Sequence, residues 1–440
     1  MTRLLIDKAE FHLNRFCLTQ PITSTADLIT NFENNNQIVV SNKLRPFLKN
    51  IGSSYHHLIN TFPEIASRLR KCDIILPNSI NELERVITKR NTERSDSSIY
   101  HLIINPTLDC NVSCWYCYEA HVADSKMTIE VAEAICMNFK KHFLDKSYKM
   151  LKLSFFGGEP LLRKATIQYL IAEADKFCKE NSLELLIDIT TNATLFTTSF
   201  LTFLSNFTCR FQITLDGHEA QHNDVKKFKS GLGNPYRLTL KNIHRIQKFI
   251  PNSYVCVRIN FDANTLLKFD DILNDIDDLD RKKTLVILKK IWQVNHQAVD
   301  RELIDNAISS LLENGFLIDY YGQGGWCFAD MDNQATINFD GKVFRCTTID
   351  RFDDTTSLGN LELSTGKIKW DADKVKYLAN MEISEKCLNC VMLPSCGGPC
   401  RKQMSQGLGE KCFLDDQGIT KEEFALIHLK INYVKDKIYG

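Results

Sequence analysis

Three cysteines crowd into one short segment, which reads CNVSCWYC and contains Cys110, Cys114 and Cys117. Three thiolates at this C-x3-C-x2-C spacing can hold a four-iron, four-sulfur cube and leave one iron open to a small molecule. A structural zinc site instead needs four ligands, and His121 is the one close residue that could add the fourth. The spacing therefore favours a cube, with zinc as the weaker alternative.

A second cysteine group lies near the end of the chain. It reads Cys387-x2-Cys390-x5-Cys396-x3-Cys400, with Cys412 after it, and upstream Cys327-x13-Gly341-x4-Cys346 precedes it. Ten of the 16 cysteines fall into these groups. The others stand singly in apolar or helical surroundings and are expected to be small core residues: Cys17, Cys72, Cys136, Cys178, Cys209 and Cys256.

Composition and charge limit the cellular compartment and the classes of partner that we expect for this chain. The first residues carry scattered charges rather than a secretion signal, and no run of about 20 apolar residues follows. Lys+Arg and Asp+Glu both number 54, so no global charge favours nucleic acid or an anionic membrane. We therefore expect a cytoplasmic protein that binds neither nucleic acid nor membrane. Because the cytosol keeps thiols reduced, the cysteines indicate metal or cluster ligands rather than disulfides.

Both cysteine patterns resemble one enzyme family. C-x3-C-W-Y-C followed by Gly157-Gly158-Glu159-Pro160 resembles the radical S-adenosylmethionine (SAM) enzymes. The later cysteines are similar to the SPASM extension of that family, which carries auxiliary iron–sulfur clusters. The resemblance covers roughly residues 100–415.

Strand-like and helix-like stretches alternate in the middle of the chain. Six apolar, β-branched runs occur at 101–105, 151–156, 184–190, 210–215, 254–261 and 284–291, with amphipathic segments such as 128–144 and 164–180 between them. This alternation predicts an α/β fold with a parallel sheet. By resemblance it is a partial (β/α)6 radical SAM barrel, in which the chemistry gathers at the C-terminal ends of the strands.

The flanking regions are expected to be separate domains. Residues 1–98 predict a small α+β domain, which resembles the winged-helix-like domains that hold leader peptides in some peptide-modifying relatives; a scaffold role is the alternative. Residues 99–317 form the expected radical SAM core and 318–415 a loop-rich SPASM domain. Residues 416–440 predict a C-terminal helix.

The resemblance also implies a cofactor site. Cys110, Cys114 and Cys117 would hold the [4Fe-4S] cluster that binds SAM, with Gly157 and Gly158 near its methionine end and Glu159 at its ammonium. Tyr116 resembles the aromatic residue that lies against adenine. Thr191, Thr214 and Asp216 end the third and fourth strands, and Arg258 ends the fifth; all four are expected to contact the cofactor. No catalytic base can be named.

Two auxiliary [4Fe-4S] clusters follow from the same resemblance. One would use Cys387, Cys390, Cys396 and Cys412, and the other Cys327, Cys346 and Cys400. The second often gains a further cysteine just before the first of the seven, where this chain has Tyr321, Gly322 and Gln323. We therefore expect one auxiliary iron without a protein thiolate.

The leading functional hypothesis is a peptide maturase that abstracts hydrogen from a ribosomally made precursor peptide and forms a thioether, carbon–carbon or ether cross-link. An electron donor such as flavodoxin or ferredoxin would serve it. The first alternative is an anaerobic sulfatase-maturating enzyme, which forms formylglycine; relatives of that kind carry an aspartate where this chain has Thr347, and the nearest acid downstream is Asp350. The second alternative is a non-catalytic iron–sulfur or zinc scaffold.

Overall fold

The computed structural model describes residues 10–96, 98–144, 148–291, 299–320, 327–379, 382–405, 407 and 409–439. The chain divides into two compact units. The first comprises residues 1–94, 321–327 and 380–429, and the second comprises 95–320, 328–379 and 430–440. Within the described residues, no helix is both long and apolar enough to cross a membrane.

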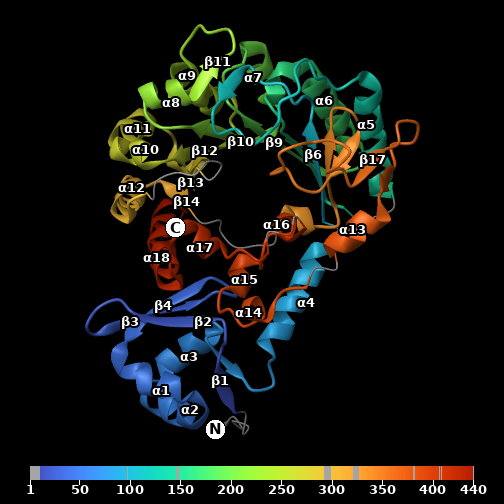
Figure 1. The fold of residues 1–440 in the computed structure, drawn as a ribbon. Helices are drawn as coiled ribbons and strands as arrows, with labels where there is room; N and C mark the ends of the chain where they lie inside the picture. Colours follow the sequence, from blue (N-terminus) through green and yellow to red (C-terminus); the bar gives the residue numbers. More distant parts are fainter. Residues whose placement is uncertain are drawn as a thin grey trace. The chain divides into compact units, whose positions relative to one another are not determined.

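The second unit is built on one large sheet, whose strands run in the order β14-β13-β12-β10-β9-β8-β6-β15-β16-β17-β18 (Figure 1). The strands from β14 to β15 in this order are all parallel. Six of them confirm the expected strands: β6 (Ile99–Asn105), β8 (Met150–Phe155), β9 (Glu184–Thr191), β10 (Thr208–Leu215), β12 (Ser253–Phe261) and β13 (Thr284–Lys290). The short strand β14 (Leu317–Asp319) extends the row.

Alternating burial explains why these segments become strands. In β8, Leu151, Leu153 and Phe155 are fully buried, whereas Lys152 and Ser154 are only half-buried. Successive side chains point to opposite faces of a strand, so one face packs under helices and the other carries polar groups. Figure 1 shows the helices α5, α6, α7 and α9 on one side of the strands. The helices of this unit are α5 (Ile129–Leu144), α6 (Lys164–Glu180), α7 (Thr198–Leu204), α8 (Glu219–Val225), α9 (Pro235–Phe249), α10 (Ala263–Leu267), α11 (Phe269–Ile276), α12 (Arg301–Glu313) and α13 (Ala372–Ala379).

Four strands from the later part of the chain complete this sheet. β15 (Gln334–Asn338) runs parallel to β6, with Thr336 opposite Ile103. β16 (Lys342–Phe344), β17 (Gly359–Leu361) and β18 (Ile368–Trp370) follow as an antiparallel meander. Leu108 packs with Phe344, Ile349 and Phe352, so this region supports the loop that follows β6.

The first unit joins the N-terminal residues to the later cysteine-rich segment. An antiparallel sheet of β2 (Cys17–Pro21), β3 (Ala26–Asn31) and β4 (Asn36–Ser41) precedes α1 (Arg45–Lys49), α2 (Ile51–Thr61) and α3 (Pro63–Lys71). β1 (Phe11–Leu13) pairs with β5 (Ile75–Pro77), and α4 (Glu82–Arg94) follows. The chain breaks between α2 and α3 at Phe62, because Pro63 lacks an N–H group and favours the first turn of a new helix.

The cysteine-rich segment of this unit consists of short helices packed on that sheet. These are α14 (Glu385–Leu388), α15 (Leu393–Cys396), α16 (Arg401–Ser405), α17 (Phe413–Gln417) and the start of α18 (Lys421–Tyr439). Leu28 and Phe32 share a buried cluster with Met392 and Phe424. The Ser395 hydroxyl donates a hydrogen bond of 2.7 Å to the carbonyl of Phe32.

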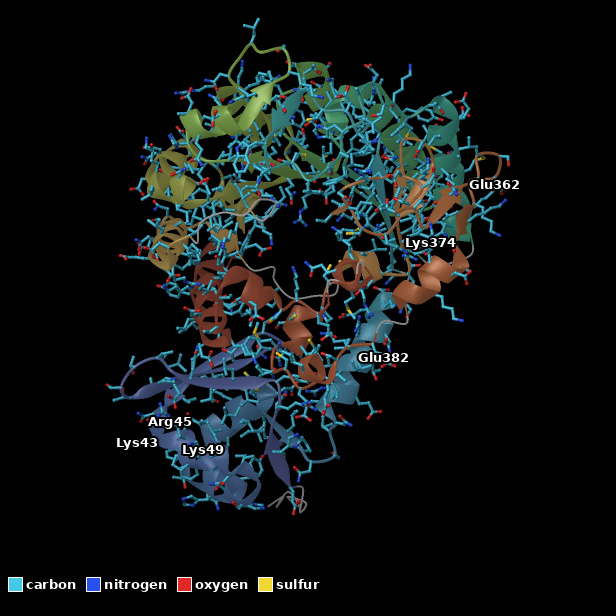
Figure 2. The ribbon with its side chains drawn as sticks, viewed as in Figure 1. Lys43, Arg45, Lys49, Glu362, Lys374 and Glu382 are labelled. Atoms are coloured by element: carbon cyan, nitrogen blue, oxygen red, sulfur yellow. The ribbon has the colours of Figure 1, made fainter. Side chains whose placement is uncertain are left out.

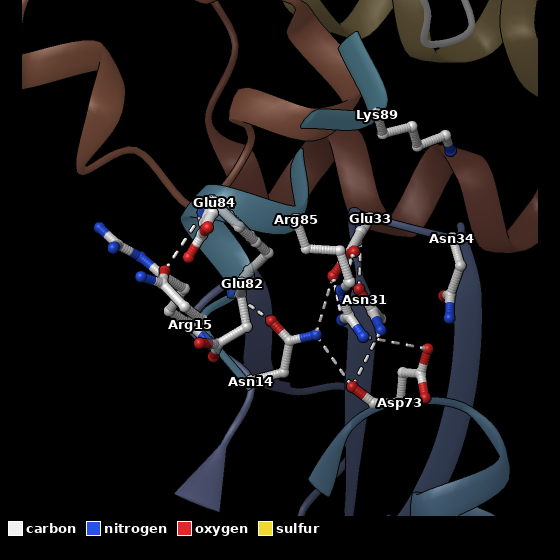
Figure 3. A network of polar contacts seen from close by, with 12 residues as sticks. Asn14, Arg15, Asn31, Glu33, Asn34, Asp73, Glu82, Glu84, Arg85 and Lys89 are labelled. Atoms are coloured by element: carbon white, nitrogen blue, oxygen red, sulfur yellow. Dashed lines mark hydrogen bonds and ion pairs between the residues drawn. The ribbon is translucent and has the colours of Figure 1, made fainter. Parts of the chain in front are cut away.

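A buried polar network ties the strands of this unit to helix α4 (Figure 3). Asn31 is fully buried and donates from Nδ2 to the carbonyls of Cys72 and Asp73, at 3.0 and 3.1 Å. Its Oδ1 accepts from the N–H of Glu33, at 2.9 Å. The Glu33 carboxylate pairs with Arg85 of α4, at 2.6 Å. Asn31 therefore joins the end of β3 to the backbone at Cys72 and Asp73, whose carbonyls also accept from Asn34 Nδ2 at 3.2 Å and from Asn14 Nδ2 at 2.9 Å, respectively.

We expect Asn31→Ala to destabilise this unit by about 1–3 kcal/mol, because the substitution removes three hydrogen bonds of a fully buried side chain. Asn34→Ala is the control, since Asn34 is exposed on the same turn and donates a single hydrogen bond to the carbonyl of Cys72. Chemical denaturation of both variants measures the difference. Equal unfolding free energies for the two variants would contradict the assigned role of Asn31.

Candidate active site at the ends of the parallel strands

The three clustered cysteines lie in the loop that follows β6. Cys110 is buried, Cys114 is half-buried and Cys117 is exposed. Cys114 ends the short strand β7 (Val112–Cys114), which pairs antiparallel with β11 (Lys226–Phe228). Burial raises the pKa of the Cys110 thiol to about 12, and the nearby Glu159 and Cys117 add to this effect. Burial also raises the pKa of Cys114, and the Cys110 and Cys117 thiols add to this effect, so the three thiols lie near one another, with Cys110 the most buried.

The thiols do not converge on one point. Among the residues that the structure describes, no group of three or more His, Cys, Asp or Glu side chains is arranged to hold a single metal ion. His121 Nε2 lies 3.5 Å from Cys117 Sγ alone. Three thiolates are the donor set that a [4Fe-4S] cube with one open iron uses.

The Gly157-Gly158 turn after β8 packs directly against the segment that leads to Cys110. Gly157 has a φ of +97°, and a Cβ atom there would lie 2.3 Å from the carbonyl oxygen of Thr107. A Cβ atom on Gly158 would lie 2.3 Å from the carbonyl oxygen of Asp109. Only glycine allows this approach. The turn and the cysteine loop are thus fixed to each other, as a cradle for a group at their junction requires.

Glu159 is fully buried, and its carboxylate is used within the protein. One oxygen accepts from the Thr191 hydroxyl and the Leu161 N–H, at 2.7 and 2.9 Å. The other accepts from the Asn192 N–H, at 2.8 Å. Burial nevertheless holds the pKa of this carboxyl above its usual value. In this arrangement Glu159 fixes the end of β9, and its contact with an ammonium group stays a prediction.

Asn192 carries this support on to the cysteine loop. Its Nδ2 donates to Asn111 Oδ1 at 2.9 Å, and lies 3.9 Å from Cys110 Sγ. Its Oδ1 accepts from the Thr194 hydroxyl, at 2.6 Å. Asn192 directly follows Thr191 at the end of β9. At this strand end, only Thr191 was expected from the sequence to contact a cofactor.

Asp216 stands at the centre of a second buried network, at the end of β10. Its Oδ1 accepts from the Tyr116 hydroxyl at 2.5 Å and from Asn260 Nδ2 at 3.0 Å. Its Oδ2 lies 2.7 Å from Lys226 Nζ. Burial favours the neutral acid, but the Lys226 ammonium and the hydrogen bonds outweigh it, so the pKa of Asp216 lies below its usual value. Asp216 is therefore an anion that orients Tyr116.

Arg258 and Thr214 adjoin this network. Arg258 Nε donates to Asn260 Oδ1 at 2.9 Å, and Thr214 lies opposite Arg258 in the register of β10 and β12. The carbonyl of Thr214 accepts from Lys226 Nζ, at 2.9 Å. The structure thus brings Tyr116, Thr214, Asp216 and Arg258 to one edge of the sheet. Their contacts with a cofactor stay predictions.

Four of the later cysteines also gather in the first unit. These are Cys387, Cys390, Cys396 and Cys412. Burial raises the pKa of the Cys387 and Cys396 thiols, and the nearby Cys390 and Cys412 thiols add to this effect. Glu410 lies beside them: its Oε1 accepts from the Ser384 N–H at 2.9 Å, and its Oε2 is 4.0 Å from Cys387 Sγ.

The remaining three expected ligands are distributed over both units. Cys346 belongs to the second unit, and Cys327 and Cys400 belong to the first. Cys346 lies near the Tyr118 side chain, whose hydroxyl donates to the carbonyl of Thr347 at 3.4 Å. Tyr321, Gly322 and Gln323, which stand where a further cysteine was considered, lie outside the described residues.

Comparison with known proteins identifies the core. Residues 104–279 match the family model of the radical SAM superfamily. These residues form a radical SAM domain. The curated proteins that this chain resembles are enzymes, among them a radical SAM cyclopropyl synthase and a sulfatase-maturating enzyme. The structure corroborates this assignment by placing the cysteine loop and the Gly157-Gly158 turn side by side at the strand ends.

Two curated relatives stand out. The radical SAM cyclopropyl synthase TigE of Paramaledivibacter caminithermalis is 21% identical over 84% of this chain and 83% of its own length. The cysteine-type anaerobic sulfatase-maturating enzyme of Clostridium perfringens is 23% identical over 68% of this chain and 88% of its own length.

A solved structure confirms the expected fold of the radical SAM enzyme. Native anSMEcpe with bound AdoMet superposes with a TM-score of 0.58 at 18% identity, over 77% of this chain and 99% of that chain. Another structure of the same protein contains the Cp18Cys peptide as well.

Sequence reasoning missed Lys226 and the supporting role of Asn192. Lys226 belongs to no motif, and its environment arises from the pairing of β11 with β7, which are more than a hundred residues apart. The one available signal was its place shortly after the Asp216-Gly217 strand end.

Proposed function

We propose that this radical SAM enzyme is a peptide maturase. It cleaves SAM reductively to a 5'-deoxyadenosyl radical, abstracts hydrogen from a ribosomally made precursor peptide and forms a thioether, carbon–carbon or ether cross-link. The observation that carries the radical step is the contact of the Gly157-Gly158 turn with the backbone just before Cys110. That contact joins the two motifs on which SAM binding depends.

Cys110, Cys114 and Cys117 hold the cluster in this proposal. A [4Fe-4S] cube with one open iron supplies the electron that breaks the sulfonium bond of SAM. The protein binds and orients the nucleotide: the glycine turn allows close backbone approach, and Asp216 holds Tyr116 for contact with adenine. Thr191 of β9, Thr214 of β10 and Arg258 of β12 are the further contacts in this proposal. Helices and buried side chains exclude water beneath it.

A peptide substrate is supported by the relatives and by the first unit. TigE is a cyclopropyl synthase, and anSMEcpe has a structure with a bound peptide. In the first unit, β4 ends the three-stranded sheet, and Val39 on it is 51% exposed. A strand at a sheet edge can accept a peptide as a further strand. Lys43 and Lys49 follow β4 and supply positive charge there, whereas Arg45 between them pairs with Asp27 (Figure 2).

The auxiliary cysteines complete the proposal. Cys387, Cys390, Cys396 and Cys412 hold one auxiliary cluster, and Cys327, Cys346 and Cys400 hold another with one iron that lacks a protein thiolate. A small electron donor such as flavodoxin or ferredoxin supplies electrons. The gathering of the first four thiols supports the first of these clusters.

Sulfatase maturation is the second candidate, because one relative carries that name. Thr347 argues against it, since a neutral hydroxyl does not accept a proton at neutral pH. The nearest acid, Asp350, is exposed, and its carbonyl accepts from the N–H of Ala120.

The proposal predicts two products under anaerobic conditions. With SAM and dithionite the purified protein should release 5'-deoxyadenosine, and a precursor peptide encoded beside the gene should lose about 2 Da, the mass of two hydrogens removed on forming one bond. Mass spectrometry of the peptide and chromatography of the nucleoside measure both. A sulfatase peptide converted to formylglycine would favour the second candidate, and absence of 5'-deoxyadenosine would overturn the radical step.

A further inference from the structure

A buried lysine lies beside the cluster loop and is not part of any motif considered above. Lys226 is 3% exposed and begins β11. Lysine is rarely buried without a partner, because removing its charge from water is costly. The buried Lys226 ammonium therefore needs compensating contacts, and those contacts indicate its role.

The Lys226 ammonium makes two contacts at the end of β10. It lies 2.7 Å from Asp216 Oδ2 and donates to the carbonyl of Thr214 at 2.9 Å. The ion pair is almost completely excluded from solvent, with side-chain exposures of 4% and 0%. A pair that is so shielded from water and salt holds its partners firmly in place.

His222 supports this arrangement as a neutral group. Its Nδ1 accepts from the backbone N–H of Asp216 at 3.1 Å, which requires an unprotonated nitrogen. Burial and the Lys226 charge lower the pKa of His222 to about 3. The positive partner of Asp216 is thus Lys226 rather than the histidine.

Lys226 also faces the second cluster cysteine. In the pairing of β11 with β7, Lys226 lies directly opposite Cys114. Residues directly opposite each other in an antiparallel pair project to the same face. Burial raises the pKa of the Cys114 thiol, and the Lys226 ammonium acts in the opposite direction, as a nearby cation must.

We propose that Lys226 is a positioning residue that holds the Asp216–Tyr116 pair in place for SAM and stabilises negative charge at Cys114. This rests on the proposed function, since it assumes a cube on the three thiolates. A cube held by three thiolates is an anion, and taking up one electron from a reductant makes it more negative. A buried cation opposite one thiolate therefore favours the reduced form.

The direction in which each substitution shifts the midpoint potential of the cluster follows from the charge that it removes. Lys226→Met removes a positive charge, so the midpoint potential of the cluster moves to more negative values. Asp216→Asn removes a negative charge from the same pair, so the potential moves to more positive values. Lys226→Arg keeps the charge and should restore most of the wild-type value. Because Asp216, the acceptor of the Tyr116 hydroxyl, loses its ion-pair partner, Lys226→Met should also weaken SAM binding roughly tenfold.

The experiment uses the full-length, anaerobically reconstituted protein. Redox titration followed by electron paramagnetic resonance gives the midpoint potential, and equilibrium dialysis with SAM gives the dissociation constant of the oxidised form. Lys227→Met is the matched control: Lys227 is the next residue along β11, is 65% exposed and pairs with Asp224 at 2.8 Å. It should match the wild type in both measurements.

A Lys226→Met protein that holds its iron and keeps the wild-type potential and SAM affinity overturns the proposal. If Lys226→Met does not fold, the other two variants test the proposal. An unchanged midpoint potential in Asp216→Asn overturns the proposal. A midpoint potential in Lys226→Arg that is far from the wild-type value overturns it as well. These outcomes differ from failure of the proposed function, in which the wild-type protein itself would not cleave SAM.

Discussion

Replacing Cys114 by alanine should abolish the release of 5'-deoxyadenosine from SAM. Cys114 is one of three thiols available to the cube at the end of β6, and it is held in β7 by pairing with β11. Two thiolates do not hold such a cube in place of three, so the variant should lose about four of about twelve irons per chain if three cubes form. Iron analysis and chromatography of the nucleoside, both under anaerobic conditions, measure the two losses.

Cys178→Ala is the matched control for this experiment. Cys178 is buried in helix α6, outside the cysteine groups, and alanine suits a helix. The control should keep its iron and its activity. Persistence of 5'-deoxyadenosine release in Cys114→Ala would count decisively against the radical assignment, whatever the peptide substrate is.

The second large effect is expected from Gly158→Ala. The added Cβ atom would lie 2.3 Å from the carbonyl oxygen of Asp109 and 2.8 Å from the carbonyl carbon of Leu108. Backbone atoms cannot move aside as a flexible side chain does, so the segment before Cys110 must shift. We expect a loss of about 1–3 kcal/mol in unfolding free energy, as for overpacked sites. Iron bound by the cluster loop should fall with it.

Gly52→Ala provides the comparison, because it also adds one methyl group to a glycine whose φ is not positive, at an exposed position. Its Cβ would meet the carbonyl oxygen of Phe11 at 3.6 Å, an ordinary contact, within helix α2. Thermal unfolding should leave Gly52→Ala at or above the wild-type midpoint. Should Gly158→Ala unfold at the wild-type midpoint with its full iron content, the close packing of turn and loop would be refuted.

Much of the core could be predicted because its signals are local. The run at 184–190 corresponds to β9 at Glu184–Thr191, and the amphipathic stretch 164–180 corresponds to α6 with the same bounds. Alternating burial and helical periodicity are properties of neighbouring residues, and therefore they are visible in sequence. The cysteine spacing is local as well, since all three thiols come from one loop.

The features that sequence could not reveal depend on distant parts of the chain. Lys226 looks like an ordinary surface lysine until β11 pairs with β7. Ser395 meets Phe32 across more than three hundred residues, so the packing of the later cysteines on the N-terminal sheet has no sequence signal. Glu159 was expected to offer its carboxylate outward, yet three donors from Thr191, Asn192 and Leu161 occupy it.

The pairing of β15 with β6 has a consequence for anyone who would trim this enzyme. A fragment ending at Tyr320 would keep every barrel strand. It would, however, leave the backbone hydrogen-bonding groups of β6 from His101 to Asn105 without the strand β15 that pairs with them. Exposed ladders of this kind recruit strands from other molecules and promote aggregation. Residues 334–338 thus act as a cap on the barrel, and shorter versions of the protein should retain them.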